Sequence, residues 1–536
     1  MKNIFLRVIV AALPFAMFSC NKMLDLKPKN SVTADSVYSN LTTMKEALAK
    51  VYGAYALTGN TGNGSSDLAG YDANTADFLR SYYYLQELPT DESICAWNDL
   101  GVPDLHYMNW KSSNSIVGGM YARSIYQISV CNSFLHQTQG DTVANSLFNQ
   151  SEADTIKRFR AEARFLRAYQ YWVLMDLIGN PPFTDENFVI GSAAPPQIKR
   201  ADLFNYIEGE LLAIQSDLAP AGKNEYARAD EGADWALLAR LYLNAKVYTG
   251  TDRYTDAITY SSKVIGTGIY SLKPKYNQLF LADNNVNNPE QILSIAYDGI
   301  NSQTSGGMTF LIQCSYNKDM AQDINYGFNG GNLAWGGMRA TSPLPRLFGQ
   351  DYTQSTDSRA KLFYGSTYDI ADPALFTQGI AVAKWRNVNS DGSIPPGTID
   401  LASTDFPLFR LAEQYLIYAE AVLRGGSGGD MNTAVSYFNK IRERAYTNGA
   451  ATVNTSGDVS AISLDLILDE RGREFYWELM RRTDLIRFGE FTTSTYVWPW
   501  KGGVAGGTSV DDKYNLYPLP VSDVQANTNL EQNPGY

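Results

Sequence analysis

The sequence predicts a mainly α-helical protein in which helical hairpins support an irregular, loop-rich lobe with short strands. Two regions, about 34–270 and about 406–490, repeat apolar residues every three or four positions, the period of a helix with one buried face. Between them, residues 272–405 lose this period and are enriched in Asn, Gly, Ser and Thr. The hydrophobic content of 44% over 536 residues can bury one large core or several smaller ones.

The N-terminus, "MKNIFLRVIVAALPFAMFSC", places basic residues beside a short apolar run that ends in small residues. We interpret residues 1–19 as an export signal, because the run is too short to span a bilayer comfortably. Cys20 follows immediately and is the candidate lipidation site. The alternative is simple secretion, with Cys20 unmodified. No later segment approaches the roughly 18 uninterrupted apolar residues of a membrane span, so any membrane attachment is by lipid.

Three segments of the first region have helical periodicity. They are "SVYSNLTTMKEALAKVYGAYAL", "GMYARSIYQISVCNSFLHQT" and "TIKRFRAEARFLRAYQYWVLMDLIG". The third is expected to end at Gly179, because glycine is a favoured C-cap and the prolines that follow cannot continue the helix.

Two helix pairs, within 238–265 and 411–441, share the pattern Leu-Ala-x-x-Tyr in the first helix and an alanine-centred second helix. Small residues at a helix crossing with aromatic residues above them resemble tetratricopeptide-type hairpins. A generic antiparallel helix pair is the alternative, and either arrangement would be scaffold.

The irregular region contains two β-prone runs, "QILSIAY" and "MTFLIQC", between turn-rich segments. Long irregular insertions are commonly functional or disordered, and the aromatic residues of this one favour function. Further on, "ERGREFYWELMRRTDLIRFGEF" predicts a return to a helix.

Composition excludes several classes of protein. The net charge of −12 would repel a nucleic-acid backbone. After Cys20, three widely spaced cysteines remain, which cannot form a disulfide framework, and with two histidines there are almost no ligands for zinc. The "GGSGG" at 425–429 joins two predicted helices and no histidine follows it, so it is not a nucleophile motif.

Two other kinds of site stay open. The stretch "ELPTDESICAWNDLGVPDL" is rich in carboxylates, and Asp91 or Asp99 could in principle serve a glycoside hydrolase. "LADNNVNNPEQ" offers oxygen ligands to a hard cation such as calcium, chiefly Asp283 and Asn285, with Asn288 and Glu290 nearby. It lacks the spacing of a calcium-binding helix-loop-helix, and an Asn-rich turn is the alternative.

Several motifs, in order along the chain, together resemble the SusD/RagB family of Bacteroidetes surface lipoproteins. They are "LDLKP", "RAEARFLRAYQYWVLMDLIGNPPF", "FPLFRLAEQYLIYAEAVL", "ERGREFYWELMRRTDLIRFG" and "NLEQNPGY". The resemblance implies a single domain, 20–536, with about four tetratricopeptide-like hairpins. It also implies a non-catalytic, lipid-anchored protein on the extracellular side of the outer membrane, which binds oligosaccharide or polysaccharide and delivers it to a SusC-like TonB-dependent transporter. The RagB branch suggests peptide cargo instead.

The resemblance also implies a ligand site. In starch-binding members of the family, an arc of aromatic side chains holds the glucan with help from an Arg and an Asn. Ser305 occupies the position of an arc tyrosine and Leu100 that of the asparagine, which argues against starch as the ligand. The candidate ligand-binding residues are Trp97 and Trp335 for stacking, Arg80, Asn98 and Asp99 for hydrogen bonds, and Ser305 and Asp72.

Overall fold

The computed structural model describes residues 37–73, 76–140, 148–189, 191–328, 334–396 and 400–536. The predicted signal segment 1–19 and Cys20 lie outside these ranges. Within them, no helix is both long and apolar enough to cross a membrane.

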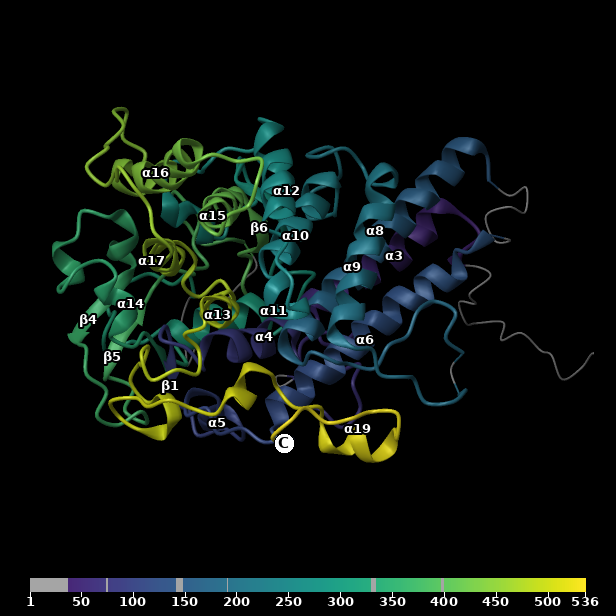
Figure 1. Cartoon of the computed structure of the whole chain (residues 1–536), viewed down its shortest axis with the longest axis horizontal. Coiled ribbons are helices and arrows are strands. Elements are labelled where there is room, and N and C mark those ends of the chain that lie inside the picture. The colour runs from purple at the N-terminus through teal and green to yellow at the C-terminus, as the bar shows by residue number, and fades with distance from the viewer. Residues whose placement is uncertain (1–36, 74–75, 141–147, 190, 329–333, 397–399) are drawn as a thin grey trace, which may run out of the picture.

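Eight helices form the scaffold, each packed on the next in chain order. They are α3 (Leu41–Ala56), α6 (Ser115–Gln137), α8 (Gln150–Leu177), α9 (Arg200–Ile214), α10 (Glu231–Leu243), α12 (Tyr254–Gly266), α15 (Leu411–Leu423) and α16 (Met431–Thr447). In Figure 1 they run from α6, α3 and α8 on the right to α15 and α16 at the upper left. Taken pairwise, they are the tetratricopeptide-like hairpins that the sequence predicts.

The two similar helix pairs, α10 with α12 and α15 with α16, are neighbours in space although the irregular lobe separates them in the chain. α12 packs on α15, and alanines of all four helices are fully buried, including Ala239, Ala257, Ala419 and Ala434. Small side chains at these crossings let the helices approach closely, so the alanine pattern repeated in the sequence serves helix packing.

Local signals explain the ends of α8. Asn149 and Glu152 form a capping box at its start, in which each side chain accepts from the other residue's backbone N–H. At the other end Gly179 has φ +85°, a conformation that glycine adopts without strain, and its N–H bonds the carbonyl of Leu174. The predicted stop at Gly179 is confirmed.

The remaining elements are shorter. The helices are α4 (Phe78–Glu87), α5 (Val102–His106), α11 (Ala245–Thr249), α13 (Gly307–Ser315), α14 (Pro343–Arg346), α17 (Leu464–Phe475), α18 (Arg481–Phe488) and α19 (Val521–Ala526). Three antiparallel strand pairs join β1 (Ile94–Cys95) to β3 (Met338–Arg339), β2 (Gln291–Ile295) to β6 (Phe406–Arg410), and β4 (Phe363–Thr367) to β5 (Gly379–Val382).

Two predictions about these elements were wrong. The run "QILSIAY" does contain strand β2, but "MTFLIQC" lies in helix α13, all of whose residues are buried. A fully apolar run has no amphipathic period, so its sequence does not distinguish a buried strand from a buried helix.

The segment 470–491, predicted as one helix, contains parts of two helices, α17 and α18. The chain between them turns through Trp477 at φ +59° and Leu479 at φ +65°.

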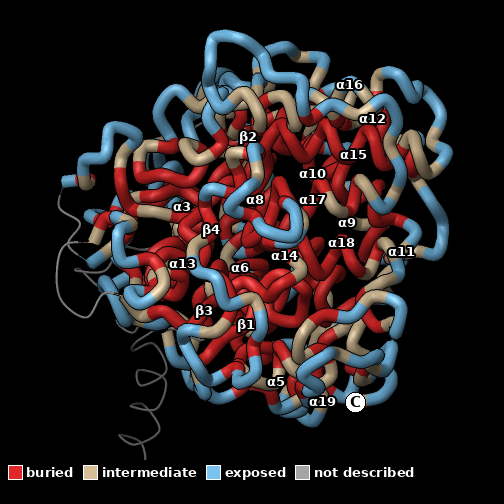
Figure 2. Tube along the Cα trace, turned by 90° about the vertical axis from the view of Figure 1, so that its left-hand side faces the viewer, coloured by how far each residue is buried: buried red, intermediate tan, exposed pale blue. Residues whose placement is uncertain are grey.

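The interior is continuous between scaffold and lobe, as the buried segments of Figure 2 show. The described cysteines, Cys95, Cys131 and Cys314, are buried and free, as predicted. Burial raises the pKa of Cys95 and of Cys131 to about 12, so both thiols stay neutral.

Candidate ligand-binding site

The irregular lobe brings Trp97 and Trp335 together. Trp97 directly follows the short ladder of β1 and β3, and the N–H of Ala96 extends that ladder to the carbonyl of Gly337. The two indole rings are 6.5 Å apart between centroids at 56°, and both are half-buried. Two partly exposed rings inclined at this angle can each contact apolar ligand surface while their inner edges stay packed.

Helix α13 forms the floor of this site. The ring of Phe310, fully buried, lies edge-on to Trp97 at 6.1 Å. The guanidinium of Arg80 lies over the same Phe310 ring at 4.6 Å, and its Nη2 donates to the hydroxyl of Tyr84 at 3.4 Å. Among the described residues the Arg80 Nε has no partner. The stack therefore holds a cation beside Trp97, with the guanidinium resting on the aromatic floor of the site.

The Asp77 side chain connects α4, the helix that carries Arg80, to the start of α13. Its Oδ1 accepts from the N–H of Arg80 at 2.8 Å and from the N–H of Gly307 at 2.9 Å. Ser305 lies just before that junction, where its N–H donates to the Asn63 side chain at 2.7 Å. Burial raises the pKa of Asp77, because its carboxylate is removed from water.

The other predicted ligand residues surround this centre less closely. Asn98 and Asp99 follow Trp97 and are exposed, as is Leu100, which is 83% exposed. Asp72 is exposed on the loop that leads into α4. The structure thus joins Arg80 to Trp97 through Phe310 and pairs Trp97 with Trp335, while Asn98, Asp99 and Asp72 are exposed.

Two residues of the site were missed from the sequence. Phe310 lies in the segment wrongly read as a strand. Phe376 is 39% exposed, and its ring lies against the backbone of Gly336, next to Trp335. No periodicity marks Phe376, because it sits in a turn whose position only the fold defines.

Gly337 is required for the placement of Trp97. It has φ +96°, and a Cβ added there would lie 2.3 Å from the indole Nε1 of Trp97. We expect Gly337→Ala to displace the indole and lower ligand affinity several-fold, and to lose about 1–3 kcal/mol of stability from the positive φ. Gly392→Ala is the matched control, since Gly392 has φ +87° but no neighbouring atom within 4 Å. Binding titrations and melting curves of both variants check this, and unchanged affinity in Gly337→Ala would contradict it.

The carboxylates of the stretch "ELPTDES" are structural. Arg481 holds Asp91 through two hydrogen bonds of 2.7 and 2.6 Å, and the Tyr496 hydroxyl donates to the same carboxylate at 2.6 Å. Asp91 is 2% exposed. A buried acid with its oxygens occupied cannot reach a glycosidic bond, so the structure does not support the hydrolase hypothesis at Asp91.

Glu87 and Glu92 accept hydrogen bonds from the turn between α17 and α18. Glu87 accepts from the N–H of Leu479 at 2.7 Å, and Glu92 from that of Trp477 at 3.2 Å. These acids therefore stabilise the two positive-φ residues. Burial raises the pKa of Glu92 to about 8, and burial together with the charge of Glu92 raises that of Glu87.

This pair predicts a pH dependence. An unfolded glutamate ionises near pH 4.5, whereas folded Glu92 keeps its proton to about pH 8. Between these values the unfolded state binds fewer protons than the folded state, so the free energy of unfolding falls as pH rises. This group contributes at most about 1.4 kcal/mol per pH unit.

We expect Glu92→Gln, which does not titrate, to show a shallower dependence of the free energy of unfolding on pH from pH 5 to 8. Glu46→Gln, on the exposed face of α3, serves as the control and should match the parent protein. Parallel curves for all three proteins would refute this role of Glu92.

The proposed calcium ligands are not gathered into one site. The carboxylate of Asp283 accepts from the N–H and hydroxyl of Ser390, at 2.9 and 2.6 Å. Glu290 faces the interior and pairs with Arg410 at 2.8 Å. The parts of the chain that the structure describes hold no cluster of three or more His, Cys, Asp or Glu suited to a metal. Calcium binding at Asp283 and Asn285 stays a prediction without geometric support.

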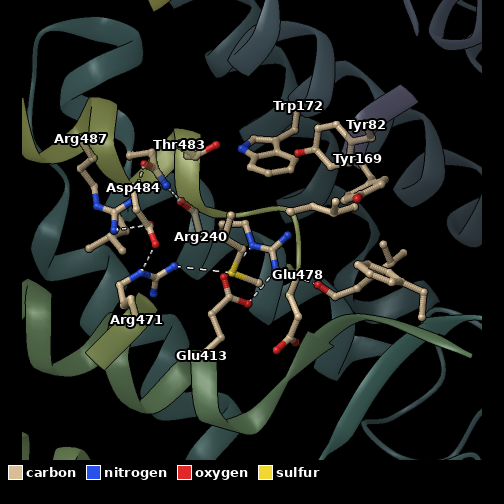
Figure 3. A pocket seen from close by; sticks show the side chains of 16 residues that line it. Tyr82, Tyr169, Trp172, Arg240, Glu413, Arg471, Glu478, Thr483, Asp484 and Arg487 are labelled. Carbon is tan, nitrogen blue, oxygen red and sulfur yellow. Dashed lines mark hydrogen bonds and ion pairs between the residues drawn. The ribbon is translucent and has the colours of Figure 1, made fainter. Parts of the chain in front are cut away.

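A small cavity of about 20 Å³ in the scaffold is part of the frame (Figure 3). Arg240 pairs with Glu413 at 2.7 Å beneath the ring of Trp172, and Arg487 and Arg471 both bind Asp484. A space of this size holds about one water molecule, so this ion-paired cluster is a structural element.

Helical hairpins stack into a solenoid-like frame that carries an irregular lobe, and this lobe presents the tryptophan pair. This architecture is typical of proteins that bind a ligand non-covalently. Residues 236–536 match the model of the SusD family. The whole chain is 36% identical to 99% of the starch-binding protein SusD of Bacteroides thetaiotaomicron. The chain belongs to the SusD family.

Solved structures agree on the fold. A SusD homologue from Bacteroides thetaiotaomicron superposes with a TM-score of 0.71 at 20% identity, covering 94% of this chain and 98% of its own. A laminarin-binding SusD-like protein superposes with a TM-score of 0.67 at 19% identity, covering 93% of this chain and 100% of its own.

Proposed function

We propose that this protein is a non-catalytic glycan-binding lipoprotein of the outer-membrane surface, and that Trp97 and Trp335 hold its ligand. The observation that supports this best is the pair of half-buried indoles 6.5 Å apart, with the Arg80 guanidinium on the Phe310 ring that Trp97 contacts. The C–H face of a sugar ring stacks on indole, and the guanidinium donates hydrogen bonds to hydroxyls.

Family membership supports the ligand class, since the 36% identical relative is named a starch-binding protein. Ser305 and Leu100 replace a tyrosine and an asparagine implied for starch binding, so the preferred glycan is expected to differ from starch. Asn98 and Asp99, exposed beside Trp97, are proposed to select its hydroxyl pattern.

The remaining parts of the proposal concern delivery. Cys20 carries the lipid, the protein faces the outside, and a SusC-like TonB-dependent transporter receives the glycan. A binder held beside its transporter works at high effective concentration, so weak single sites suffice. Co-purification from detergent-solubilised outer membranes tests the transporter, and a Cys20→Ala variant released from the membrane fraction would support the anchor.

The ligand is tested by titrating residues 21–536 with amylopectin, laminarin, dextran and a casein peptide digest. The proposal expects binding to at least one polysaccharide and none to peptides. Peptide binding alone would favour the RagB-like alternative. Release of reducing sugar from a bound glycan would overturn the non-catalytic assignment, and Asp99→Asn would show whether Asp99 causes it.

A further inference from the structure

Two adjoining cavities lie away from the tryptophan site, between α3, β2 and the loops 222–230 and 296–302. The larger has a volume of about 420 Å³ and the smaller about 170 Å³. The wall between them is shared and includes Tyr226, Asn285, Leu293 and Ser294. We call the pair the Tyr226 groove. None of Trp97, Trp335, Arg80 and Phe310 lines it, so it is a separate site.

The walls of the groove combine aromatic rings with neutral hydrogen-bonding groups. The Tyr226 side chain is 50% exposed at its mouth, and Tyr52 and Tyr55 of α3 line its interior. Side-chain amides and hydroxyls add hydrogen-bonding groups. They come from Asn285, Asn301, Ser302 and Ser294 in the larger cavity and from Asn224, Asn288 and Gln291 in the smaller. The smaller cavity also has the charged side chains of Glu225, Arg228 and Asp230.

The groove also leaves polar groups without partners. Ser294 is only 5% exposed and lines both cavities. Its hydroxyl lies near that of Tyr226 but makes no hydrogen bond of normal geometry to any described residue. The Nε2 of Gln291 in the smaller cavity also makes no hydrogen bond to a described residue. A buried donor without a partner destabilises the unliganded protein, so a ligand hydroxyl that reaches it on binding stabilises the complex.

The charge of the larger cavity selects against anions. Among the residues that the structure describes, no Lys or Arg lines it, whereas Asp298 and Asp405 do. The smaller cavity has one arginine, Arg228, whose charge is paired with Glu162 at 2.6 Å. Partial burial raises the pKa of Asp298, but hydrogen bonds from the N–H groups of Ser302, Asn301 and Ile300 outweigh it and hold the pKa at about 2. Asp298 is therefore ionised. Asp405 accepts from the Tyr226 hydroxyl at 2.5 Å and from the Tyr297 N–H at 2.7 Å.

We propose that the Tyr226 groove is a second saccharide site, which takes one to three units of a neutral oligosaccharide. Its larger cavity falls within the roughly 300–1,000 Å³ typical of small-molecule sites. Tyrosine faces suit the apolar face of a pyranose, amides and the Ser294 hydroxyl suit its hydroxyls, and the carboxylates repel uronic or sulfated sugars. The ligand class rests on the proposed glycan-binding function, but the site does not depend on Trp97.

The test uses maltotriose and laminaritriose as neutral probes and tri-galacturonate as the anionic one, titrated into the Trp97→Ala protein by calorimetry. One neutral trisaccharide is expected to bind at a 1:1 ratio, and tri-galacturonate not at all. Ala296→Trp, added to this background, fills the larger cavity from an exposed position and should weaken binding at least tenfold. Ala451→Trp, an exposed alanine outside the groove, should leave it unchanged.

A second variant covers the case in which Ala296→Trp does not fold. Tyr226→Ala opens the groove and should also weaken trisaccharide binding at least tenfold. The second site would be overturned if Trp97→Ala bound no trisaccharide, or if binding survived both groove variants. In either case, polysaccharide binding by the parent protein would still support the proposed function. Parent protein that binds a trisaccharide only through the groove would instead refute the Trp97 site.

Discussion

Trp97→Ala is expected to lower the affinity for the preferred polysaccharide by roughly 30- to 100-fold. Contact between a sugar face and the exposed part of the indole buries about 100 Å² of apolar surface, worth ~2.5 kcal/mol at ~25 cal/mol per Å². The loss should appear mainly in the dissociation rate, because the variant removes contacts and leaves the approach to the site unchanged. Calorimetry or affinity electrophoresis with the polysaccharide found in the screen measures it.

Two comparisons make this result specific. Tyr437→Ala removes a half-buried aromatic ring on α16 that packs on Tyr415 and Tyr418 of the scaffold helix α15, and it should bind like the parent protein. Trp97→Phe keeps a smaller stacking face and should fall between the two. Because Trp335 stacks in the same site, the double variant Trp97→Ala/Trp335→Ala should lose less than the sum of the single losses. Affinity of Trp97→Ala within twofold of the parent protein would show that the ligand lies elsewhere.

Arg410→Met is expected to destabilise the protein by about 3–5 kcal/mol, the largest stability effect of a single substitution that we predict. Arg410 is 1% exposed at the end of β6 and binds Glu290 and Glu478, each at 2.8 Å, and Glu474 at 2.5 Å. Its removal leaves these acids buried with less compensating charge. Urea or thermal unfolding of both proteins at pH 7 measures the loss.

The control for this variant is Lys199→Met, which breaks the exposed pair with Glu531 and should change stability by about 0–1 kcal/mol. Arg410→Lys keeps a charge but not the planar fork, so we expect it to recover part of the loss. Stability of Arg410→Met equal to that of Lys199→Met would show that the buried network is not required.

The same network sets the behaviour in acid. Burial alone would raise the pKa of Glu470, but the guanidinium groups of Arg359, Arg473 and Arg442 hold it at about 2. An acid with a depressed pKa contributes stability above its unfolded value near 4.5, and this contribution is lost as pH falls toward 2. Glu92 acts in the opposite sense at higher pH, so maximal stability is expected near pH 5.

The sequence by itself determined the helical frame. Helices α3, α6 and α8 were readable because apolar residues recur in them every three or four positions, although residues 165–177 of α8 are buried on every side. The Gly179 stop was readable because glycine and proline act locally. The composition and motif order likewise indicated the family, since they require no knowledge of long-range contacts.

Only the tertiary structure decided what the chemically distinctive residues do. Asp91 looked like a candidate acid until Arg481, distant in sequence, was found against it. The pairing of Trp97 with Trp335, the Phe310 floor and the Phe376 ring depend on a β1–β3 ladder of two residues per strand, too short to leave a pattern. Periodicity reports which face of an element is buried, whereas a binding site depends on which distant segments meet, and that is set by packing across the whole chain.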